Sequence, residues 1–237
     1  MTRGDTLYIA MVGLPARGKT TVAGKLKENL QKDGIRTRIF NNGQLRRKLE
    51  PKDTSYPEFY DPKNQEGVAF REKIALMNIS RAQKFIRGKG QVAILDATNV
   101  SLKRRAVISK LLAGHPILFI ECINDDQGIL KSSIQRKIVL PEFRHLSKAG
   151  AIRSFTQRIH YYESIYVPLD REENLVKLDS LNNRIIIEDI SRDIPYFDRI
   201  RDCLVTDIIR NLFLIRHGET YFNLETRTRG DSSLTPS

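Results

Sequence analysis

Short apolar runs alternate with longer segments of helical period along most of the chain. A run of strand length between polar or glycine positions predicts a buried β-strand, whereas apolar residues spaced three and four apart predict a helix with one buried face. The predicted strands are Leu7–Val12, Thr37–Phe40, Val92–Leu95, Ile117–Glu121, Leu175–Leu178 and Ile185–Ile187. The predicted helices are Lys19–Lys32, Glu66–Ile86, Leu102–Ala113, Gln127–Arg136, Ile152–Tyr166 and Pro195–Ile209. This alternation is typical of an α/β fold with a largely parallel sheet.

Two segments fall outside the alternation. The stretch from Glu50 to Asn64 holds three prolines among polar residues and predicts a loop, which is either a lid over a substrate or a plain surface excursion. Near the end, Leu212–Ile215 predicts a new strand that is followed at once by the sequence RHGE. We therefore expect a first domain over residues 1–210 and the start of a second domain, cut short, over residues 211–237.

Composition narrows the class of protein. Apolar residues make up 40% of the chain and charged residues 29%, which fits a soluble globular protein rather than a disordered or collagen-like one. No apolar run approaches the length of a membrane span, and the polar first residues do not form a secretory signal, so we expect a cytoplasmic location. Cys122 and Cys203 are too few for a disulfide framework, and we interpret both as reduced packing residues.

The net charge of +12 requires an anionic partner or a strongly basic surface. Nucleic acid is one candidate, and anionic metabolites held by arginines are another. Composition alone does not choose between these two classes of partner, so the choice depends on motifs.

The clearest chemical motif lies between the first predicted strand and the first predicted helix. Its sequence, GLPARGKT, matches the phosphate-binding pattern G-x-x-x-x-G-K-[ST] in the position that this pattern requires. Backbone N–H groups of such a loop bind the β-phosphate, Lys19 reaches the β- and γ-phosphates, and Thr20 ligates Mg²⁺. The residues expected to bind ATP are Gly13, Leu14, Pro15, Ala16, Arg17, Gly18, Lys19, Thr20 and Thr21. The alternative is a glycine-rich turn that binds nothing.

A carboxylate, Asp96, closes the apolar strand VAILD. At the carboxyl end of a parallel strand it would lie where ligands bind in doubly wound sheets. There it could hold Mg²⁺ or accept the proton of an attacking hydroxyl, or it could only cap the helix that follows. The polar residues that come next are Thr98, Asn99, Arg104 and Arg105. Such a sequence suits a kinase that grips an anionic acceptor.

Other cationic residues follow predicted elements elsewhere in the chain. Arg46 and Arg47 come after the second strand, and Arg71 lies early in a long helix. Arg158 and Tyr162 are four residues apart, on one helical face. Each arginine taken singly is most simply a solvated surface charge, because spacing alone cannot show that the side chains converge.

Six short motifs follow one another in an order that is more informative than any one of them. They are MVGLPARGKT (Met11–Thr20), FNNGQLRR (Phe40–Arg47), LDATN (Leu95–Asn99), FIE (Phe119–Glu121), RIHYYE (Arg158–Glu163) and PLD (Pro168–Asp170). In this order the chain resembles the kinase half of the 6-phosphofructo-2-kinase/fructose-2,6-bisphosphatase family. The first motif includes a Pro-Ala-Arg that most phosphate loops lack, and the resemblance runs from about Tyr8 to the last residues.

This resemblance implies a P-loop NTPase-type three-layer α/β sandwich with a mainly parallel sheet, followed by the truncated start of a phosphoglycerate-mutase-like domain. It implies that ATP, with Mg²⁺, phosphorylates the 2-hydroxyl of fructose 6-phosphate to give fructose 2,6-bisphosphate. The residues that it assigns to fructose 6-phosphate are Arg46, Arg71, Thr98, Arg104, Lys137, Arg158 and Tyr162. Those that it makes catalytic are Lys19, Asp96 and Lys137, with Thr20 and Asp96 beside the Mg²⁺. Family members are usually homodimers through the kinase domain.

The chain departs from the family pattern at two places. Vertebrate members carry a cysteine near the active site where this chain has Asn124, so neither Cys122 nor Cys203 is given a role. Few residues precede the first strand, so we expect the regulatory N-terminal extension of some members to be absent.

The segment LIRHGETYFN resembles the beginning of the family's histidine phosphatase domain. In that domain His217 would be the nucleophile, and Arg216 and Asn223 would bind phosphate. The remaining parts of such a domain would lie beyond Ser237, so we expect no phosphatase activity.

Two other functions remain open from the residues. A polynucleotide 5′-hydroxyl kinase also combines a phosphate loop with an aspartate at a strand end, and a basic chain suits it. Against it, the lysines and arginines are scattered rather than gathered with aromatic residues on one element, so we expect no nucleic-acid partner. A nucleotide-binding regulatory module without catalysis would keep the loop but should have lost the acceptor residues.

Overall fold

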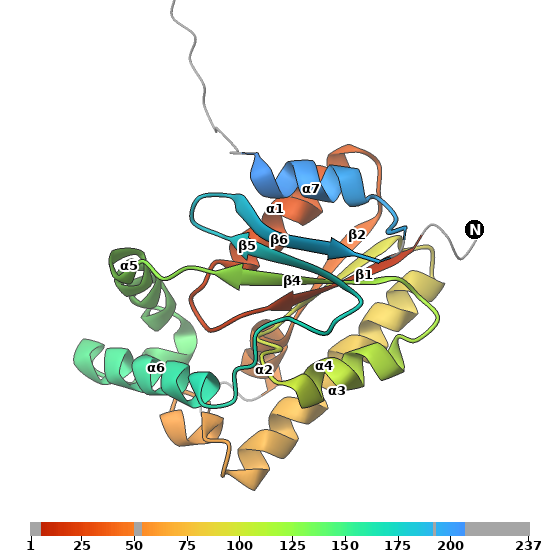
Figure 1. Cartoon of the computed structure of the whole chain (residues 1–237). Helices are drawn as coiled ribbons and strands as arrows, with labels where there is room; N and C mark the ends of the chain where they lie inside the picture. The colour runs from red at the N-terminus through yellow and green to blue at the C-terminus, as the bar shows by residue number, and fades with distance from the viewer. Residues whose placement is uncertain (1–5, 50–53, 192, 207–237) are drawn as a thin grey trace, which may run out of the picture. The chain divides into compact units, whose positions relative to one another are not determined.

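Strand β1 (Leu7–Val12) lies in the middle of the sheet, and all six of its residues are buried. The computed structural model describes residues 6–49, 54–191 and 193–206, and in it the strands have the order β2-β3-β1-β4-β5-β6 (Figure 1). The other strands are β2 (Thr37–Asn41), β3 (Val92–Asp96), β4 (Ile117–Ile123), β5 (Asn174–Asp179) and β6 (Arg184–Ile190). All six strands predicted between residues 7 and 187 are confirmed, with ends that differ by at most three residues.

Neighbouring strands run parallel from β2 through β5, and β6 pairs antiparallel with β5. The sheet is therefore mainly parallel, as predicted. Because parallel strands end at the same edge, the segments that follow β1 to β5 all leave the sheet on one side.

Helices occupy both faces of this sheet. The α-helices of the described residues are α1 (Lys19–Lys32), α2 (Asn42–Leu49), α3 (Gln65–Arg87), α4 (Leu102–Leu111), α5 (Gln127–Ile138), α6 (Lys148–Glu163) and α7 (Phe197–Val205). Two short 3₁₀ helices are η2 (Pro57–Tyr60) and η3 (Pro141–Phe143). Helix α6 begins four residues earlier than predicted because Ser147 Oγ accepts a hydrogen bond from Gly150 N (3.1 Å) and caps it there. Helix α7 begins at Phe197 rather than Pro195, and residues 207–209 of the predicted helix lie outside the described part.

The hydrophobic core is divided between the two faces of the sheet. Alternate residues of a strand point to opposite faces, so Ile9 joins a cluster with α1 and α7 whereas Tyr8 joins a cluster with α3 and α4. Figure 1 shows these two helix pairs on opposite sides of the sheet. Each buried aliphatic side chain contributes about 1.5–3 kcal/mol, and the predicted three-layer α/β arrangement follows from these two interfaces.

A third cluster lies apart from the sheet, between α5, η3 and α6. Its buried members are Ile138, Phe143, Ala151, Phe155 and Ile159. These helices carry Lys137 and Arg158, so a small separate core holds one wall of the site described below.

Helix α2 was not predicted. Its only buried residue is Arg46, and Leu49 is exposed, so it has no apolar stripe for a pattern to reveal. Asn41, which follows Phe40 in β2, starts the helix by accepting a hydrogen bond from Gln44 N (2.8 Å) on Oδ1. The helix is therefore held by its cap and by its charged partners rather than by a hydrophobic face.

The segment predicted as a loop from Glu50 to Asn64 contains η2 and is not a plain surface excursion. Thr54, Ser55 and Tyr60 are buried. Ser154 Oγ of α6 donates a hydrogen bond to the backbone carbonyl of Ser55, which fastens the segment to the third cluster. Residues 50–53 lie outside the described part.

No described helix combines the length and the apolar composition needed to cross a membrane. The strand predicted at Leu212–Ile215 and the domain division near residue 210 fall in or beside the undescribed residues 207–237 and stay predictions.

Candidate active site

The candidate site is a cleft of about 960 Å³ at the carboxyl edge of the sheet. Strands β1 and β4 are neighbours in the sheet, but the chain that leaves β1 continues to β2 on one side, whereas the chain that leaves β4 continues to β5 on the other side. The two connections diverge, and this divergence opens a crevice between the carboxyl ends of β1 and β4. The phosphate loop, Asp96 and residues of α2, α3, α5 and α6 line this cleft.

The phosphate loop has the backbone that its glycines permit. Gly13 has φ +131°, and a Cβ there would lie 2.6 Å from the carbonyl oxygen of Cys122. Gly18 has φ +82°, and a Cβ there would lie 2.9 Å from Ser180 Oγ. Both positions therefore require glycine, which lets the loop fold closely over the ends of β4 and β5. Helix α1 begins directly after it, so its unpaired N–H groups face the cleft.

Lys19 is buried, and its Nζ donates a hydrogen bond to the carbonyl oxygen of Leu14 (2.5 Å). Burial lowers the pKa of Lys19 to about 8, although the nearby Cys122 and Asp96 act in the opposite direction. A buried ammonium that is short of counter-charge is a strong binder of phosphate, because the phosphate supplies the missing charge.

Asp96 is buried at the end of β3, opposite Asn41 of β2 in the register of the sheet. Asn41 Nδ2 donates a hydrogen bond to Asp96 Oδ2. Helix α4 is capped by Ser101, whose Oγ accepts from Arg104 N, so the interpretation of Asp96 as a helix cap is wrong. Sequence reasoning missed Asn41. The signal that could have identified it was a polar residue at the end of the neighbouring strand.

The structure brings the acceptor residues implied by the family resemblance into this one cleft. They are Arg46, Arg71, Thr98, Arg104, Lys137, Arg158 and Tyr162. Of the proposed nucleotide residues, those from Pro15 to Thr21 line the cleft, whereas Gly13 and Leu14, at the start of the loop, do not. Ten lysines and arginines and three carboxylates line the cleft among the described residues, so its net charge is strongly positive.

Two carboxylates that sequence reasoning missed hold the arginines. Glu142 of η3 is buried and pairs with Arg46, and its other oxygen lies 3.5 Å from Arg47 Nη1. Glu72 of α3 pairs with Arg104 (2.7 Å). No local pattern marks Glu142 or Glu72, because each partner lies on a different element.

Several guanidinium nitrogens in the cleft remain without a partner. The Nε atoms of Arg46, Arg104 and Arg158 and Nη1 of Arg17 are buried and have no hydrogen-bond acceptor among the described residues. Buried donors are normally satisfied, so these four N–H groups point to an anionic ligand that supplies the acceptors.

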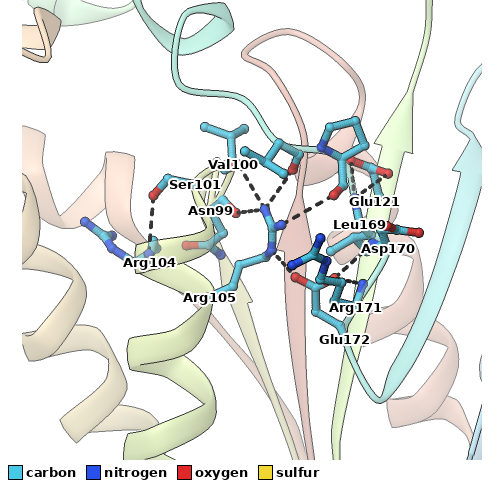
Figure 2. A network of polar contacts seen from close by, with 12 residues as sticks. Asn99, Val100, Ser101, Arg104, Arg105, Glu121, Leu169, Asp170, Arg171 and Glu172 are labelled. Atoms are coloured by element: carbon cyan, nitrogen blue, oxygen red, sulfur yellow. Dashed lines mark hydrogen bonds and ion pairs between the residues drawn. The ribbon is translucent and has the colours of Figure 1, made fainter.

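Arg104 and Arg105 are neighbours in sequence but point in different directions (Figure 2). Arg105 is only 2% exposed, and its Nη1 donates to the carbonyl oxygens of Val100 (2.9 Å) and Val167 (2.9 Å). Its Nε donates to Glu172. Arg105 therefore links the loop after β3 to the segment before β5 and does not line the cleft.

Two of the quoted motifs meet beside this network. Glu121 of FIE is fully buried, and its carboxylate accepts a hydrogen bond from Leu169 N of PLD (3.3 Å) and one from Tyr166 Oη (2.6 Å). Figure 2 shows Glu121 beside this segment. The two motifs therefore support the frame of the site rather than its chemistry.

Both cysteines are buried in the cluster of α1 and α7. Burial raises the pKa of the Cys122 thiol to about 12, even though Lys19 nearby lowers it, and burial also raises the pKa of Cys203. Asn124, at the position of the family's cysteine, lines the cleft, whereas Cys122 does not. The interpretation of the cysteines as packing residues agrees with these positions.

We expect neither thiol of the folded protein to react with the disulfide reagent DTNB at pH 8 within minutes. A thiol with a pKa near 12 is about 10⁻⁴ ionised at that pH, and the thiolate is the reactive form. In concentrated guanidinium chloride both cysteines should react. Stoichiometric release of the chromophore from the folded protein would contradict the assignment.

The cleft offers oxygen ligands for a hard cation but no dedicated cage. The described residues contain no group of three His, Cys, Asp or Glu side chains placed to hold a metal. Thr20 and Asp96 both line the cleft, and the described contacts of Asp96 leave Oδ1 without a hydrogen bond. This donor set fits Mg²⁺ that arrives with nucleotide phosphates, since Mg²⁺ is commonly held by one or two carboxylates together with phosphate oxygens.

The residues assigned to a phosphatase segment, Arg216, His217 and Asn223, lie outside the described part of the chain, and their roles stay predictions.

Comparisons of the sequence with a family model and with known proteins point to the same family. The family model described as 6-phosphofructo-2-kinase matches residues 2–216. The human protein 6-phosphofructo-2-kinase/fructose-2,6-bisphosphatase 3 is 34% identical over an alignment of 250 positions, which covers 99% of this chain and 46% of the relative. The rat protein 6-phosphofructo-2-kinase/fructose-2,6-bisphosphatase 4 is 36% identical over an alignment of 249 positions, which covers 100% of this chain and 52% of the relative. This chain thus spans about half the length of these relatives.

Among solved structures, the Mycobacterium tuberculosis APS kinase aligns at 15% identity with a TM-score of 0.49, covering 85% of this chain and 99% of that one. That likeness is too distant to add to the fold described above.

Proposed function

The chain belongs to the 6-phosphofructo-2-kinase family, and on that premise we propose that it transfers the γ-phosphoryl group of ATP to the 2-hydroxyl of fructose 6-phosphate. The products are ADP and fructose 2,6-bisphosphate. The observation that carries the proposal is that the phosphate loop and the acceptor arginines line one strongly positive cleft with Asp96 at its base.

In this proposal the phosphate loop holds the nucleotide. Backbone N–H groups of the loop and of the first turn of α1 bind the β-phosphate, and Lys19 turns from Leu14 to the β- and γ-phosphates. Mg²⁺ that is bound with the nucleotide would be held by Thr20 directly and by Asp96 through water, which leaves Asp96 Oδ1 free as a proton acceptor, and it would supply charge neutralisation at the phosphates.

In this proposal, arginines that line the cleft hold the acceptor. Arg46, Arg104 and Arg158 offer unpartnered Nε donors to the 6-phosphate, a match that a bidentate guanidinium makes well. The 2-hydroxyl oxygen then attacks the γ-phosphorus while the bond from that phosphorus to the β–γ bridging oxygen breaks. The hydroxyl proton passes to Asp96, whose carboxylate Asn41 orients. Catalysis here is chiefly positioning and charge stabilisation, so no covalent intermediate on the protein is needed.

An ADP-release assay with Mg-ATP tests the proposal. It compares fructose 6-phosphate, fructose 1-phosphate, a 5′-hydroxyl oligonucleotide and no acceptor, and checks the acid lability of the sugar product. We expect turnover with fructose 6-phosphate alone and an acid-labile 2-phosphate. Turnover with the oligonucleotide, or tight ATP binding with no turnover on any acceptor, would overturn it.

Nucleotide binding should take up protons at alkaline pH. Lys19 with a pKa of about 8 is half protonated at pH 8 in the free protein, and a bound phosphate raises its pKa and completes protonation. We expect an uptake of about 0.5 proton per site at pH 8 and weaker ADP binding as pH rises further. Calorimetry in two buffers of different ionisation enthalpy measures the uptake.

The matched control for proton uptake is Lys19→Arg, which keeps the charge and does not titrate in this range. The variant should bind ADP with no alkaline proton uptake. Equal uptake in both proteins would assign the proton to another group.

A further inference from the structure

One aromatic side chain contacts three of the cleft arginines. The guanidinium carbon of Arg158 lies 4.1 Å from the centroid of the Tyr60 ring, that of Arg46 lies 5.4 Å from it, and that of Arg71 lies 5.8 Å from it. All three distances are within the range in which a cation is attracted to the negative face of a ring. Tyr60 belongs to η2, whereas the arginines come from α2, α3 and α6, so the ring is where these elements meet.

The three guanidinium groups repel one another, and carboxylates do not balance all of them. Arg46 is paired with Glu142, but Arg158 and Arg71 make no ion pair with a described carboxylate. Arg158 is flanked instead by the rings of Tyr60 and Phe155, the latter at 5.4 Å. Aromatic faces attract the cations without neutralising them, so the charge stays available to a ligand.

Burial and a hydrogen bond fix the position of the Tyr60 side chain. The side chain is 3% exposed, and its hydroxyl donates a hydrogen bond to the carbonyl oxygen of Thr54 (3.0 Å). Burial raises the pKa of Tyr60, so the phenol is neutral at physiological pH and keeps this hydrogen bond. Tyr60 itself does not line the cleft, whereas all three arginines and Tyr162, whose ring centroid lies 5.9 Å from that of Tyr60, do.

We propose that Tyr60 is a positioning residue of the acceptor site, whose ring gathers Arg46, Arg71 and Arg158 into one receptor for a phosphate monoester. The inference rests on the proposed function and extends it, because it names the residue that makes the site prefer a phosphorylated sugar over a neutral one. It acts through the arginines, so its effect falls on affinity for the acceptor phosphate and not on the nucleotide.

The test compares Tyr60→Leu, which keeps a buried apolar side chain but removes the ring face, with Tyr60→Phe, which keeps the ring and loses only the hydroxyl. We expect Tyr60→Leu to raise the KM for fructose 6-phosphate at least about tenfold, with the KM for ATP within about twofold of wild type. Tyr60→Phe should stay within about threefold for both substrates. The matched control is Tyr8→Leu, because Tyr8 is a buried tyrosine of the sheet core outside the cleft.

Unchanged KM for fructose 6-phosphate in Tyr60→Leu, equal rises for both substrates, or the same rise in Tyr8→Leu would overturn the proposal. If Tyr60→Leu does not fold, phenylalanines of increasing fluorine content at position 60 weaken the ring face with little change of shape. The KM for fructose 6-phosphate should then rise with each added fluorine, and a KM independent of fluorine content would also overturn it.

Direct titration with inorganic phosphate separates this inference from the proposed function. Phosphate should bind wild type at least about tenfold more tightly than Tyr60→Leu whether or not fructose 6-phosphate is turned over. Equal phosphate affinities would refute the role of Tyr60 alone. Absence of turnover in a wild type that still shows the difference would refute only the assigned reaction.

Discussion

The Lys19→Met substitution is expected to lower kcat for phosphoryl transfer by about 10³-fold or more, a loss of about 4 kcal/mol of transition-state stabilisation. Lys19 is the lysine of the phosphate loop, it is buried and lines the cleft, and in the proposed reaction its ammonium faces the negative charge that develops on the transferred group. A methionine of similar length fills the space but supplies neither charge nor donor. The measurement is the single-turnover rate at saturating ATP and acceptor.

The fold should not suffer from this change. Burial lowers the pKa of Lys19 from 10.5 to about 8, so below pH 8 the protonated side chain costs the folded state free energy, and the cost fades between those two values. Lys19→Met removes the cost, so its thermal midpoint at pH 7 should equal or exceed that of wild type. Lys32→Met, at the exposed end of the same helix, is the control and should change neither rate nor midpoint. A near-normal rate in folded Lys19→Met protein would refute the role of the loop.

The second large effect is on stability, and it concerns Arg105. Arg105→Met should lower the free energy of unfolding by about 3–5 kcal/mol, because it leaves the largely buried carboxylate of Glu172 and several carbonyl oxygens without their donor. The midpoint of urea unfolding, with an unchanged slope, measures the loss.

The neighbouring Arg104→Met is the matched control for Arg105→Met. Its ion pair with Glu72 is partly exposed, so it should cost at most about 1 kcal/mol while raising the KM for the sugar phosphate. Similar stability losses in the two variants would contradict the division of roles between these adjacent residues. The effect of Arg105→Met should also shrink in acid. Burial raises the pKa of Glu172, but the hydrogen bond and charge of Arg105 together with backbone N–H donors lower it on balance, and the resulting stabilisation is lost as pH falls through that pKa.

The sheet and its main helices could be predicted because their signals are local. A strand such as Val92–Asp96 is apolar at every position before its last residue. The helix after Gly18 follows the phosphate-loop sequence pattern, which predicts both the loop conformation and the helix. Helix α2 escaped prediction because its one buried residue is Arg46, so no apolar period exists to detect.

The site could be predicted only in part. The convergence of Arg71 and Arg158 followed from a family resemblance, not from spacing. Asn41, Glu142 and Tyr60 were missed because each meets its partner across many residues of sequence, and sequence pattern does not encode such contacts. The divergence of Arg104 and Arg105 has a simpler cause, since consecutive helical residues point about 100° apart.

The separate hydrophobic cluster of α5, η3 and α6 has a consequence for how such a kinase can diverge. Its buried members are separate from the two cores that hold the sheet to α1, α3, α4 and α7, although Ala16 of the phosphate loop packs against it. We expect substitutions in this small cluster to reshape the wall that carries Lys137 and Arg158 while the sheet keeps its geometry, provided that the contact with Ala16 is kept. We therefore expect selection for a new acceptor to act on the segment from α5 to α6. Exchange of this segment between related kinases should alter acceptor preference.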